Sequence, residues 1–321
     1  MGSVVLSLDA ELGWGFHDFE SPPVDRVEAG RRGWSVMLEL LEEYDVPATW
    51  AVVGHLMLDS CDGTHADHPA PPGWFAPERT EWRNRPDLRF APALVEALFD
   101  SDVDHEFASH SFSHVLFGDP ETDRELAAAE LDRSMDIAAD WGRTIESFVY
   151  PRNDVGHRDV LAEYGFGVYR GKSPTHDGVR GLFDSIVRSR SMLVEPAVDE
   201  YGLVNVPASL FLFGFEGPAR TAAESVWADP MVVQARLGID EAARRDGVFH
   251  MWLHPNNLTD PRDDERMRAI LEHLDRRREE TDIRVETMGE TARRLENGRT
   301  VDGRVPSVEY DATELSSTPS D

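Results

Sequence analysis

The sequence predicts an α/β fold in which parallel strands alternate with helices, and three observations support this. Short apolar runs of strand length recur along the chain, beginning with residues 4–8. Segments with helical apolar spacing lie between them, as at Trp34, Met37, Leu38 and Leu41. Such strand–helix units are typical of a parallel sheet or a barrel, and roughly seven or eight of them in one chain favour the barrel.

Each expected element has a local signal. A continuous apolar run predicts a strand buried on both faces, and the expected strands are residues 4–8, 48–53, 106–109, 145–150, 166–169, 203–206, 248–253 and 283–286. Pro92 suits the first turn of a helix, and Thr122 with Glu125 forms a candidate capping box for a long helix ending near Gly142. The other expected helices are residues 34–41, 94–99, 157–164 and 267–274.

The (β/α) domain is expected to span residues 1–296. Two long segments, 55–89 and 173–200, interrupt the alternation, and loops of this length often shape a binding site. The remaining tail, residues 297–321, is polar, acidic and poor in apolar side chains, which predicts disorder.

Acidic residues dominate the charge of the chain. Asp and Glu number 61 against 32 Lys and Arg, which gives a formal net charge of -29, and Lys172 is the only lysine. A chain this acidic repels nucleic acid and anionic membranes, so neither is expected as a partner. The acids spread along the whole chain, which favours a halophilic protein over an acidic surface for a cationic partner.

The expected location is the cytoplasm. A single cysteine, Cys61, excludes an internal disulfide and fits a reducing compartment. The amino terminus runs directly into an apolar strand, without the basic and long apolar regions of a secretory signal. The chain contains no run of about 18 apolar residues, so no membrane-spanning helix is expected. The sequence leaves open whether the protein forms a homo-oligomer.

A pair of histidines, His110 and His114, gives the clearest chemical signal. On a helical turn, a spacing of four residues lets both imidazoles reach one metal ion. Asp9 and Glu11 follow the first expected strand, and two carboxylates this close can divide metal binding and proton transfer between them. Two loop histidines without a ligand, and a solvated acidic pair, are the alternative interpretations.

Two further signals follow later strands. His254 ends the strand 248–253 and suits a general acid, because an unperturbed imidazole titrates near neutrality; a simple hydrogen bond at a strand end is the alternative. Arg152 follows the strand 145–150 and could orient a carboxylate or bind an anionic substrate group, or lie in a surface turn. All four signals lie at the carboxyl ends of separate strands, which converge on one face of a barrel. The set therefore predicts a hydrolytic site.

These motifs resemble the polysaccharide deacetylase family, the carbohydrate esterases related to the nodulation chitooligosaccharide deacetylases. The resemblance runs from residue 4 to about residue 290 and rests on Ser7-Leu8-Asp9, residues 48–54, 105–114 and 148–153, and Leu253-His254-Pro255. It implies a distorted (β/α) barrel of about seven parallel strands. It also implies the removal of an N-acetyl group from an amino sugar in a polysaccharide, an oligosaccharide or a lipid- or nucleotide-linked glycan.

The resemblance also implies roles for individual residues. His110 and His114 would bind one divalent metal ion, with zinc expected first and manganese, cobalt or nickel as alternatives. Asp9 corresponds to the general base and His254 to the general acid, and Arg152 would hold Asp9 in place.

This chain departs from the common family pattern at Ala10, where most members have a second aspartate as metal ligand. Glu11 is therefore assigned as the third ligand, with Asp9 as the other choice. Arg152 follows Pro151, whereas the usual arginine precedes the proline. This form resembles members that act in the synthesis of surface polysaccharides, and the residues expected to contact substrate are Trp14, Tyr150, Asn153 and Arg170.

Two alternatives to the N-deacetylase stay open. One is a deformylase or another amide or imide hydrolase with the same fold, including one that acts on a cyclic ureide. The other is an inactive relative that binds sugars without metal, which Ala10 keeps open and the retained histidines oppose.

Overall fold

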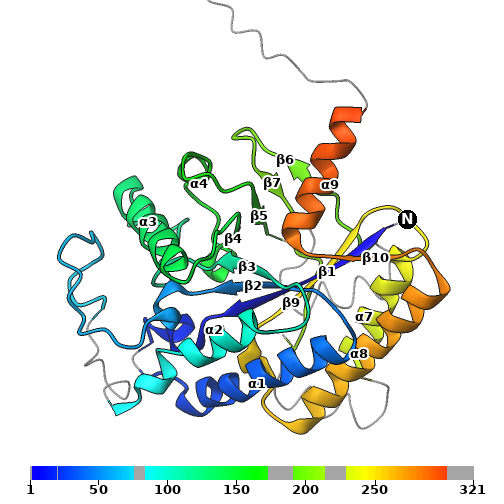
Figure 1. Cartoon of the computed structure of the whole chain (residues 1–321), viewed down its shortest axis with the longest axis horizontal. Helices are drawn as coiled ribbons and strands as arrows, with labels where there is room; N and C mark the ends of the chain where they lie inside the picture. The colour runs from blue at the N-terminus through cyan, green and yellow to red at the C-terminus, as the bar shows by residue number, and fades with distance from the viewer. Residues whose placement is uncertain (1, 20, 76–83, 173–190, 214–228, 302–321) are drawn as a thin grey trace, which may run out of the picture.

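A curled, mostly parallel sheet forms the centre of the computed structural model, which describes residues 2–19, 21–75, 84–172, 191–213 and 229–301 (Figure 1). The strands run in the order β6-β7-β5-β4-β3-β2-β1-β9-β8, and β10 also pairs with β1. Their bounds are β1 (Ser3–Ala10), β2 (Thr49–Val52), β3 (Glu106–Ser109), β4 (Ser147–Val149), β5 (Val168–Arg170), β6 (Ala197–Val198), β7 (Val204–Asn205), β8 (Leu210–Phe211), β9 (Val248–Leu253) and β10 (Arg284–Glu286).

The sheet is a half-barrel, which confirms the predicted α/β class and the distorted barrel. Every pairing between these strands is parallel except the one between β6 and β7. Within the described residues, β6 and β8 end the hydrogen-bonded order and do not pair with each other. The curled sheet is therefore open on one side.

Most of the helices pack on the outside of the sheet, whereas α9 contributes residues to the cluster inside it (Figure 1). The α-helices are α1 (Val24–Glu43), α2 (Pro92–Phe99), α3 (Arg124–Asp140), α4 (Arg158–Glu163), α7 (Pro230–Ala242), α8 (Pro261–Glu280) and α9 (Met288–Val301), and short 3-10 turns are η1 (Leu12–Phe16), η2 (Gly54–Met57), η4 (Pro86–Leu88), η5 (Pro151–Asn153) and η6 (Pro255–Asn257). Over the described chain, none of the helices is both long enough and apolar enough to cross a membrane.

The two faces of β1 pack into different parts of the core. Val4, Leu6 and Leu8 belong to the large cluster that includes apolar residues of α1, α7 and α8. Val5 belongs to a second cluster inside the half-barrel, together with Met288 of α9. Because side chains alternate along a strand, Asp9 lies on the same inner face as Val5. The alternation of β1 thus directs a carboxylate into the half-barrel.

Several sequence predictions differ from the observed elements. The N-cap of α3 is Asp123, whose side chain accepts a hydrogen bond from the Leu126 amide at 2.9 Å, so the predicted Thr122–Glu125 capping box is wrong. The Thr122 hydroxyl instead donates to the Leu116 carbonyl at 2.7 Å. The predicted tail began at residue 297, but α9 continues to Val301; the rest of that tail lies outside the described residues, as do 76–83 and 173–190 of the two long segments.

Candidate active site

Three loops at one end of the sheet bring most of the predicted catalytic and metal-binding residues together. Glu11 follows β1, His110 and His114 follow β3, and His254 follows β9. These strands occupy neighbouring positions in the order β3-β2-β1-β9, and all run parallel. Their carboxyl ends therefore point to one edge of the half-barrel, on the left in Figure 1.

Glu11, His110 and His114 form a compact buried group. One potential ligand atom from each residue lies within 4.8 Å of the other two. The Glu11 Oε2 atom is 3.0 Å from His114 Nε2 and 3.6 Å from His110 Nε2. One carboxylate and two imidazoles are a ligand set typical of a catalytic divalent metal site, which keeps further positions for water or substrate.

The hydrogen bonds of His110 indicate which ring nitrogen is available to bind a metal ion. Its Nδ1 atom lies 2.8 Å from the Val149 carbonyl oxygen, which can only accept, so Nδ1 carries the proton. The Nε2 atom then presents a lone pair towards Glu11, and it is buried without a hydrogen-bond partner among the described residues. A backbone carbonyl that orients an imidazole in this way is the usual support of a metal-bound histidine. The residues therefore fit a divalent cation.

Electrostatics favours the ligand forms of these side chains. Burial alone would raise the pKa of Glu11, but the neighbouring imidazoles of His254, His110 and His114 hold it well below its usual range. Burial lowers the pKa of His114 and outweighs the opposite effect of Glu11. An ionised carboxylate and a neutral imidazole are the forms that bind metals.

Asp9 is held by Arg170 and not by Arg152. Two Arg170 nitrogens donate to the two Asp9 oxygens, each at 2.6 Å, and both side chains are almost completely buried. Arg170 also donates to Ser7 Oγ at 3.0 Å and to Asn153 Oδ1 at 3.0 and 3.1 Å. Burial would raise the pKa of Asp9, but the Arg170 charge and hydrogen bonds lower it overall, so the carboxylate is ionised.

The predicted contact of Arg152 with Asp9 is wrong. Arg152 is exposed and donates to Asp18 at 2.5 and 3.0 Å. The cause lies in the backbone, because Arg152 follows β4 in a left-handed turn with φ of 52°. Arg170 ends the next strand, β5, on the inner face, and its side chain reaches Asp9 directly.

His254 is the most accessible of these residues. Its side chain is 21% exposed, against 8% for Glu11 and 0% for His110, so a substrate would reach the group from the His254 side. Its Nε2 atom is 3.6 Å from Glu11 Oε1 and 3.8 Å from Asp9 Oδ2. Asn257 Oδ1 lies 3.2 Å from Nδ1 and also accepts from the His254 amide, which orients the ring.

Three of the four residues expected to contact substrate are less accessible to a substrate than His254. Tyr150 is fully buried in an aromatic cluster, and Trp14 is 1% exposed and donates to the Arg89 carbonyl at 3.0 Å. Arg170 is fully buried and committed to Asp9, so direct substrate contact does not fit these three positions. Asn153 is partly exposed, but its amide oxygen already accepts from Arg170.

Three loops of the site have a strained backbone. Eight described non-glycine residues have positive φ, and five of them lie in these loops: Leu12, Ser111, His114, Arg152 and Asn153. Each such conformation costs on the order of 1–3 kcal/mol and persists only where surrounding contacts enforce it. Strain gathered at these loops is typical of a functional site.

Sequence reasoning missed several supporting residues. Ser7 contacts both Arg170 and His250, with its Oγ 2.8 Å from His250 Nε2. Glu130 of α3 accepts from the Ser113 amide at 2.8 Å and so holds the loop between the two histidines. Phe211 stacks on Trp252 with ring centroids 4.1 Å apart, and both rings face His254 at their edges. A serine two residues before Asp9, on the same face of β1, was the available signal for Ser7, and it is a weak one.

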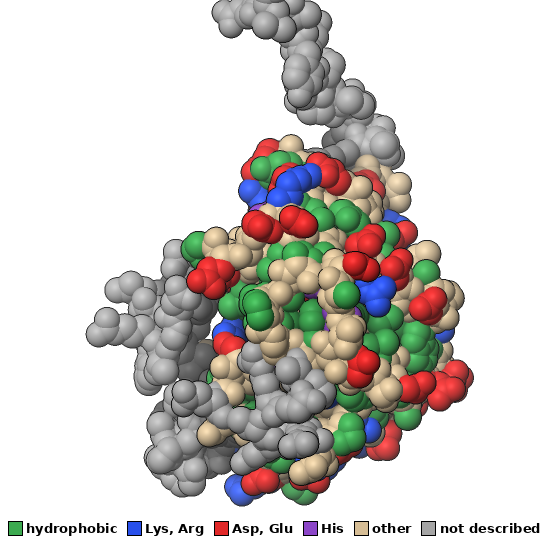
Figure 2. Space-filling model, turned by 90° about the vertical axis from the view of Figure 1, so that its left-hand side faces the viewer, with side chains coloured by type: hydrophobic (Ala, Val, Ile, Leu, Met, Phe, Trp, Pro, Cys, Tyr) green, Lys and Arg blue, Asp and Glu red, His purple; other side chains and the backbone are tan. Residues whose placement is uncertain are grey.

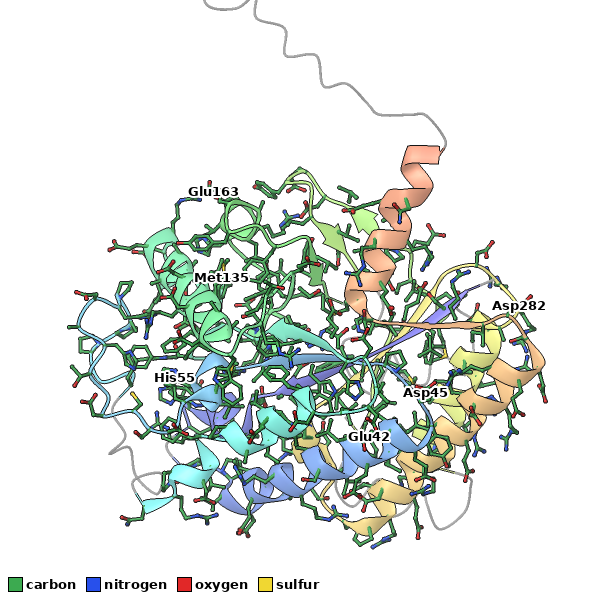
Figure 3. The ribbon with its side chains drawn as sticks, in the orientation of Figure 1. Glu42, Asp45, His55, Met135, Glu163 and Asp282 are labelled. Atoms are coloured by element: carbon green, nitrogen blue, oxygen red, sulfur yellow. The ribbon has the colours of Figure 1, made fainter. Side chains whose placement is uncertain are left out.

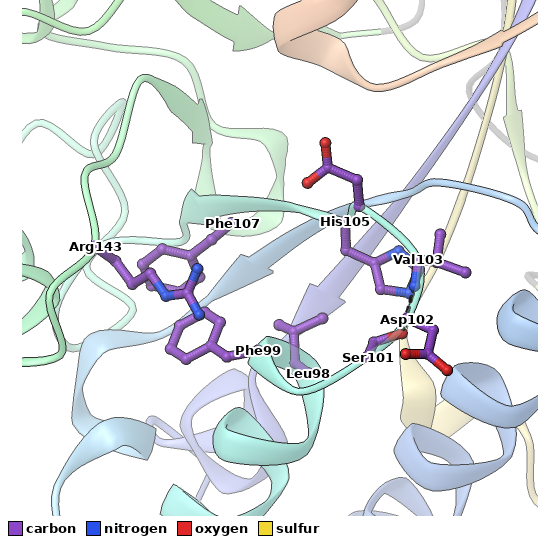
Figure 4. Close-up of a pocket in the computed structure, with 9 residues that line it drawn as sticks. Leu98, Phe99, Ser101, Asp102, Val103, His105, Phe107 and Arg143 are labelled. Atoms are coloured by element: carbon purple, nitrogen blue, oxygen red, sulfur yellow. Dashed lines mark hydrogen bonds between the residues drawn. The ribbon is translucent and has the colours of Figure 1, made fainter.

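The pocket in Figure 4 lies away from the Glu11–His110–His114 group. It is lined by the end of α2, the loop through Asp102 and His105, and Phe107 of β3, with Arg143 stacked 4.1 Å from the Phe99 ring. This is the amino end of β3, opposite to the histidine pair that follows its carboxyl end. None of the predicted catalytic residues lines it.

Figure 2 shows the molecule from the side at which these strands end. Acidic side chains are scattered around its rim, and histidine is visible near the centre among hydrophobic and uncharged groups. The fold and the site together define a class: an α/β half-barrel with buried carboxylates and histidines at the carboxyl ends of its strands, which fit a divalent metal ion.

Comparison with known proteins gives a family match for part of the chain and a shared fold for most of it. Residues 23–168 match the model of the family described as polysaccharide deacetylase, which confirms the resemblance found in the motifs over this part of the chain. The match includes His110 and His114. Asp9, Glu11 and His254 lie outside it, so their assignments rest on the geometry. None of the curated proteins matches the chain.

Solved structures with low sequence identity share the fold. A putative polysaccharide deacetylase from Mycobacterium smegmatis has a TM-score of 0.62 at 16% identity, covering 92% of this chain and 91% of that one. A probable polysaccharide deacetylase from Pseudomonas aeruginosa PAO1 has 0.57 at 14%, covering 92% and 91%. The PuuE allantoinase has 0.56 at 14%, covering 92% and 90%. The shared fold extends over almost the whole chain.

Proposed function

We propose that this protein is a metal-dependent hydrolase that removes an N-acetyl group from an amino sugar. The single observation that carries the proposal is the buried Glu11–His110–His114 group, with Asp9 and His254 beside it. The family whose model matches residues 23–168 supports a carbohydrate substrate from which an acyl group is removed.

The ligands would be Glu11, His110 and His114. A divalent ion bound there would polarise the acyl carbonyl and lower the pKa of a water molecule. We propose zinc first, because two imidazoles and a carboxylate are typical zinc ligands, although manganese, cobalt or nickel accept the same set. Glu11 is favoured over Asp9 as the ligand, since both Asp9 oxygens accept from Arg170.

Asp9 and His254 would move the protons. Asp9 is ionised, as a base must be, and keeps lone pairs beyond the two that accept from Arg170. It would take a proton from the attacking water. His254 Nε2 faces both carboxylates from the exposed side and would donate a proton to the nitrogen as the C–N bond breaks, because an amine leaves poorly as an anion.

The first test measures acetate released from a panel of N-acetylated sugars by protein loaded with zinc. Asp9→Asn and His254→Ala should each lower turnover on the order of 10²- to 10⁴-fold and keep their metal. His273→Ala is the matched control, since His273 pairs with Asp240 between α7 and α8 and should keep full activity. Loss of metal in Asp9→Asn would instead make Asp9 a ligand and Glu11 the base.

The panel also separates the alternative functions. An N-formylated sugar and allantoin should be included, because a fold shared with PuuE allantoinase does not distinguish these substrates. Formate release or ring opening with no acetate release would replace the proposed reaction. Sugar binding without any turnover by the metal-loaded protein would identify an inactive relative. The cytoplasmic location stays a prediction.

A further inference from the structure

A second group of potential metal ligands lies after β2. His55 belongs to η2, and Cys61 and His65 lie in the segment that follows (Figure 3 shows His55). One potential ligand atom from each residue lies within 4.8 Å of the other two. His65 Nε2 is 3.3 Å from His55 Nε2 and 3.0 Å from Cys61 Sγ. This group shares no residue with the Glu11–His110–His114 group.

The separations suit tetrahedral coordination. With metal–nitrogen bonds of about 2.0–2.1 Å, two imidazole nitrogens on a tetrahedral zinc ion lie about 3.3–3.4 Å apart, which matches the His55–His65 distance. A sulfur at about 2.3 Å would lie about 3.6 Å from such a nitrogen. Cys61, in a partly exposed segment, would therefore move by roughly half an ångström.

The neighbours of His55 and Cys61 orient their ligand atoms. His55 Nδ1 lies 3.1 Å from the Phe112 carbonyl, so Nδ1 carries the proton and Nε2 presents a lone pair to the group. The Gly63 amide donates to Cys61 Sγ at 3.2 Å, which orients the sulfur within the group. Burial holds the pKa of His55 well below its usual value and keeps the ring neutral.

In a metal-free interpretation, hydrogen bonds alone hold the side chains of His55, Cys61 and His65 together. In that case His65 Nε2 carries a proton and shares it between His55 Nε2 and Cys61 Sγ. Three ligand atoms converging inside an aromatic enclosure, with Phe75 and Phe112 beside His55, would then serve packing alone. The two interpretations differ in metal content and in the reactivity of the thiol.

We propose that His55, Cys61 and His65 bind a second divalent cation of the zinc class, separate from the ion proposed at Glu11, His110 and His114. A thiolate with two imidazoles selects borderline and soft metals such as zinc over magnesium or calcium. Among the described residues three protein ligands converge, and water would complete a tetrahedral site.

The second ion would stabilise the loop of the proposed catalytic site. His55 contacts Phe112 three times: its ring lies 4.0 Å from the Phe112 ring, and its Nδ1 and its amide each donate to the Phe112 carbonyl. The Gly54 amide donates to the Ser111 carbonyl at 3.0 Å. Ser111 and Phe112 lie between His110 and His114, so fixing His55 fixes the loop that presents both histidines.

Cobalt binding to the full-length, metal-free protein tests this proposal. Cys61 is the only cysteine, so a thiolate-to-cobalt charge-transfer band in the near ultraviolet reports on this site alone. The Glu11–His110–His114 group contains no sulfur and cannot produce the band. We expect the wild-type band to saturate with one bound cobalt, while total binding reaches two ions per chain. A wild-type titration without the band would overturn the proposal, whatever the variants do.

Two variants separate this site from the proposed catalytic one. Cys61→Ser should lose the band and one bound ion, and His110→Ala should keep the band and also lose one ion. Circular dichroism should show that both are folded. If His110→Ala abolished the band, the two groups would not be separate sites and the proposal would fail. In zinc-loaded wild type, a thiol reagent should modify Cys61 more slowly than in metal-free protein; equal rates would contradict a zinc thiolate.

Discussion

At the scale of single residues, the environment of an arginine decides what it contributes. Arg170 is fully buried, and all its donors face Asp9, Ser7 or Asn153. Arg152 is exposed and pairs with Asp18, which is also exposed. Exposed pairs are screened by water, whereas breaking a buried pair leaves an uncompensated charge in the interior.

This contrast predicts unequal effects of two matched substitutions. Arg170→Met should lower the free energy of unfolding by about 3–5 kcal/mol, because it leaves Asp9 buried and unpaired. Arg152→Met should cost about 0–1 kcal/mol. Urea unfolding of both variants measures the difference, and the double variant Asp9→Asn/Arg170→Met should recover part of the loss. Equal costs for the two single variants would show that Arg170 is not the partner of a buried charge.

Gly15 offers a way to disturb the proposed metal site without removing a ligand. A Cβ atom at this position would lie 2.1 Å from Glu11 Oε1, so Gly15→Ala must displace the carboxylate. We expect weaker zinc affinity at the Glu11–His110–His114 site, with the cobalt–thiolate band of Cys61 unchanged. Gly167→Ala is the control, because nothing lies within 4 Å of its added Cβ. Unchanged zinc affinity in Gly15→Ala would argue against Glu11 as a ligand.

At the scale of elements, α3 depends on a cap that the sequence pattern placed one residue too early. Asp123→Ala removes the side-chain acceptor of the Leu126 amide and should lower the free energy of unfolding by about 1 kcal/mol. Glu125→Ala, at the position predicted to complete the capping box, should change it by less than about 0.5 kcal/mol. Thermal and urea unfolding check both values. A larger cost for Glu125→Ala would restore the original capping assignment.

The predictability of an element followed its length and burial. β1 is buried throughout and β9 nearly so, and the sequence placed both within two residues at each end. β6 and β8 contain two residues each, too few for a periodic signal. The helix α7 was not predicted, although Val232, Ala235 and Ile239 are buried at helical spacing. This spacing is a signal that the sequence contains.

Site residues that are close together in the sequence were easier to predict than partners that are far apart. The His110–His114 pair is a local pattern, and the strand ends indicated which residues would meet it. The partner of Asp9 could not be found in this way, because Arg170 lies 161 positions away and Arg152 had a similar place at a strand end. Only the direction of the side chains, inward for Arg170 and outward for Arg152, distinguishes the two.

At the scale of the whole molecule, charge is carried on the outside. The acids Glu42, Asp45, Glu163 and Asp282 are all exposed, and Glu163 and Asp282 lie at the periphery in Figure 3. Acidic side chains outnumber basic ones on the face in Figure 2. The formal net charge is -29. Like charges at this density repel one another in the folded state more than in an expanded chain, so stability should depend on ions in solution.

Salt should therefore stabilise the fold in two stages. The Debye length falls from about 10 Å at 0.1 M to about 3 Å at 1 M, so screening of the repulsion should raise the melting temperature mainly below about 1 M KCl. A further rise above that concentration must come from salt-dependent burial or hydration, because little screening is left to gain. Thermal melts from low to molar KCl measure both stages, and potassium sulfate at matched ionic strength separates them, since sulfate also strengthens apolar burial. A halophilic protein should continue to gain stability above about 1 M KCl, in the second stage. A curve that levels off near 1 M would indicate simple charge screening, and a melting temperature that does not change with salt would contradict the halophilic interpretation of the acidic surface.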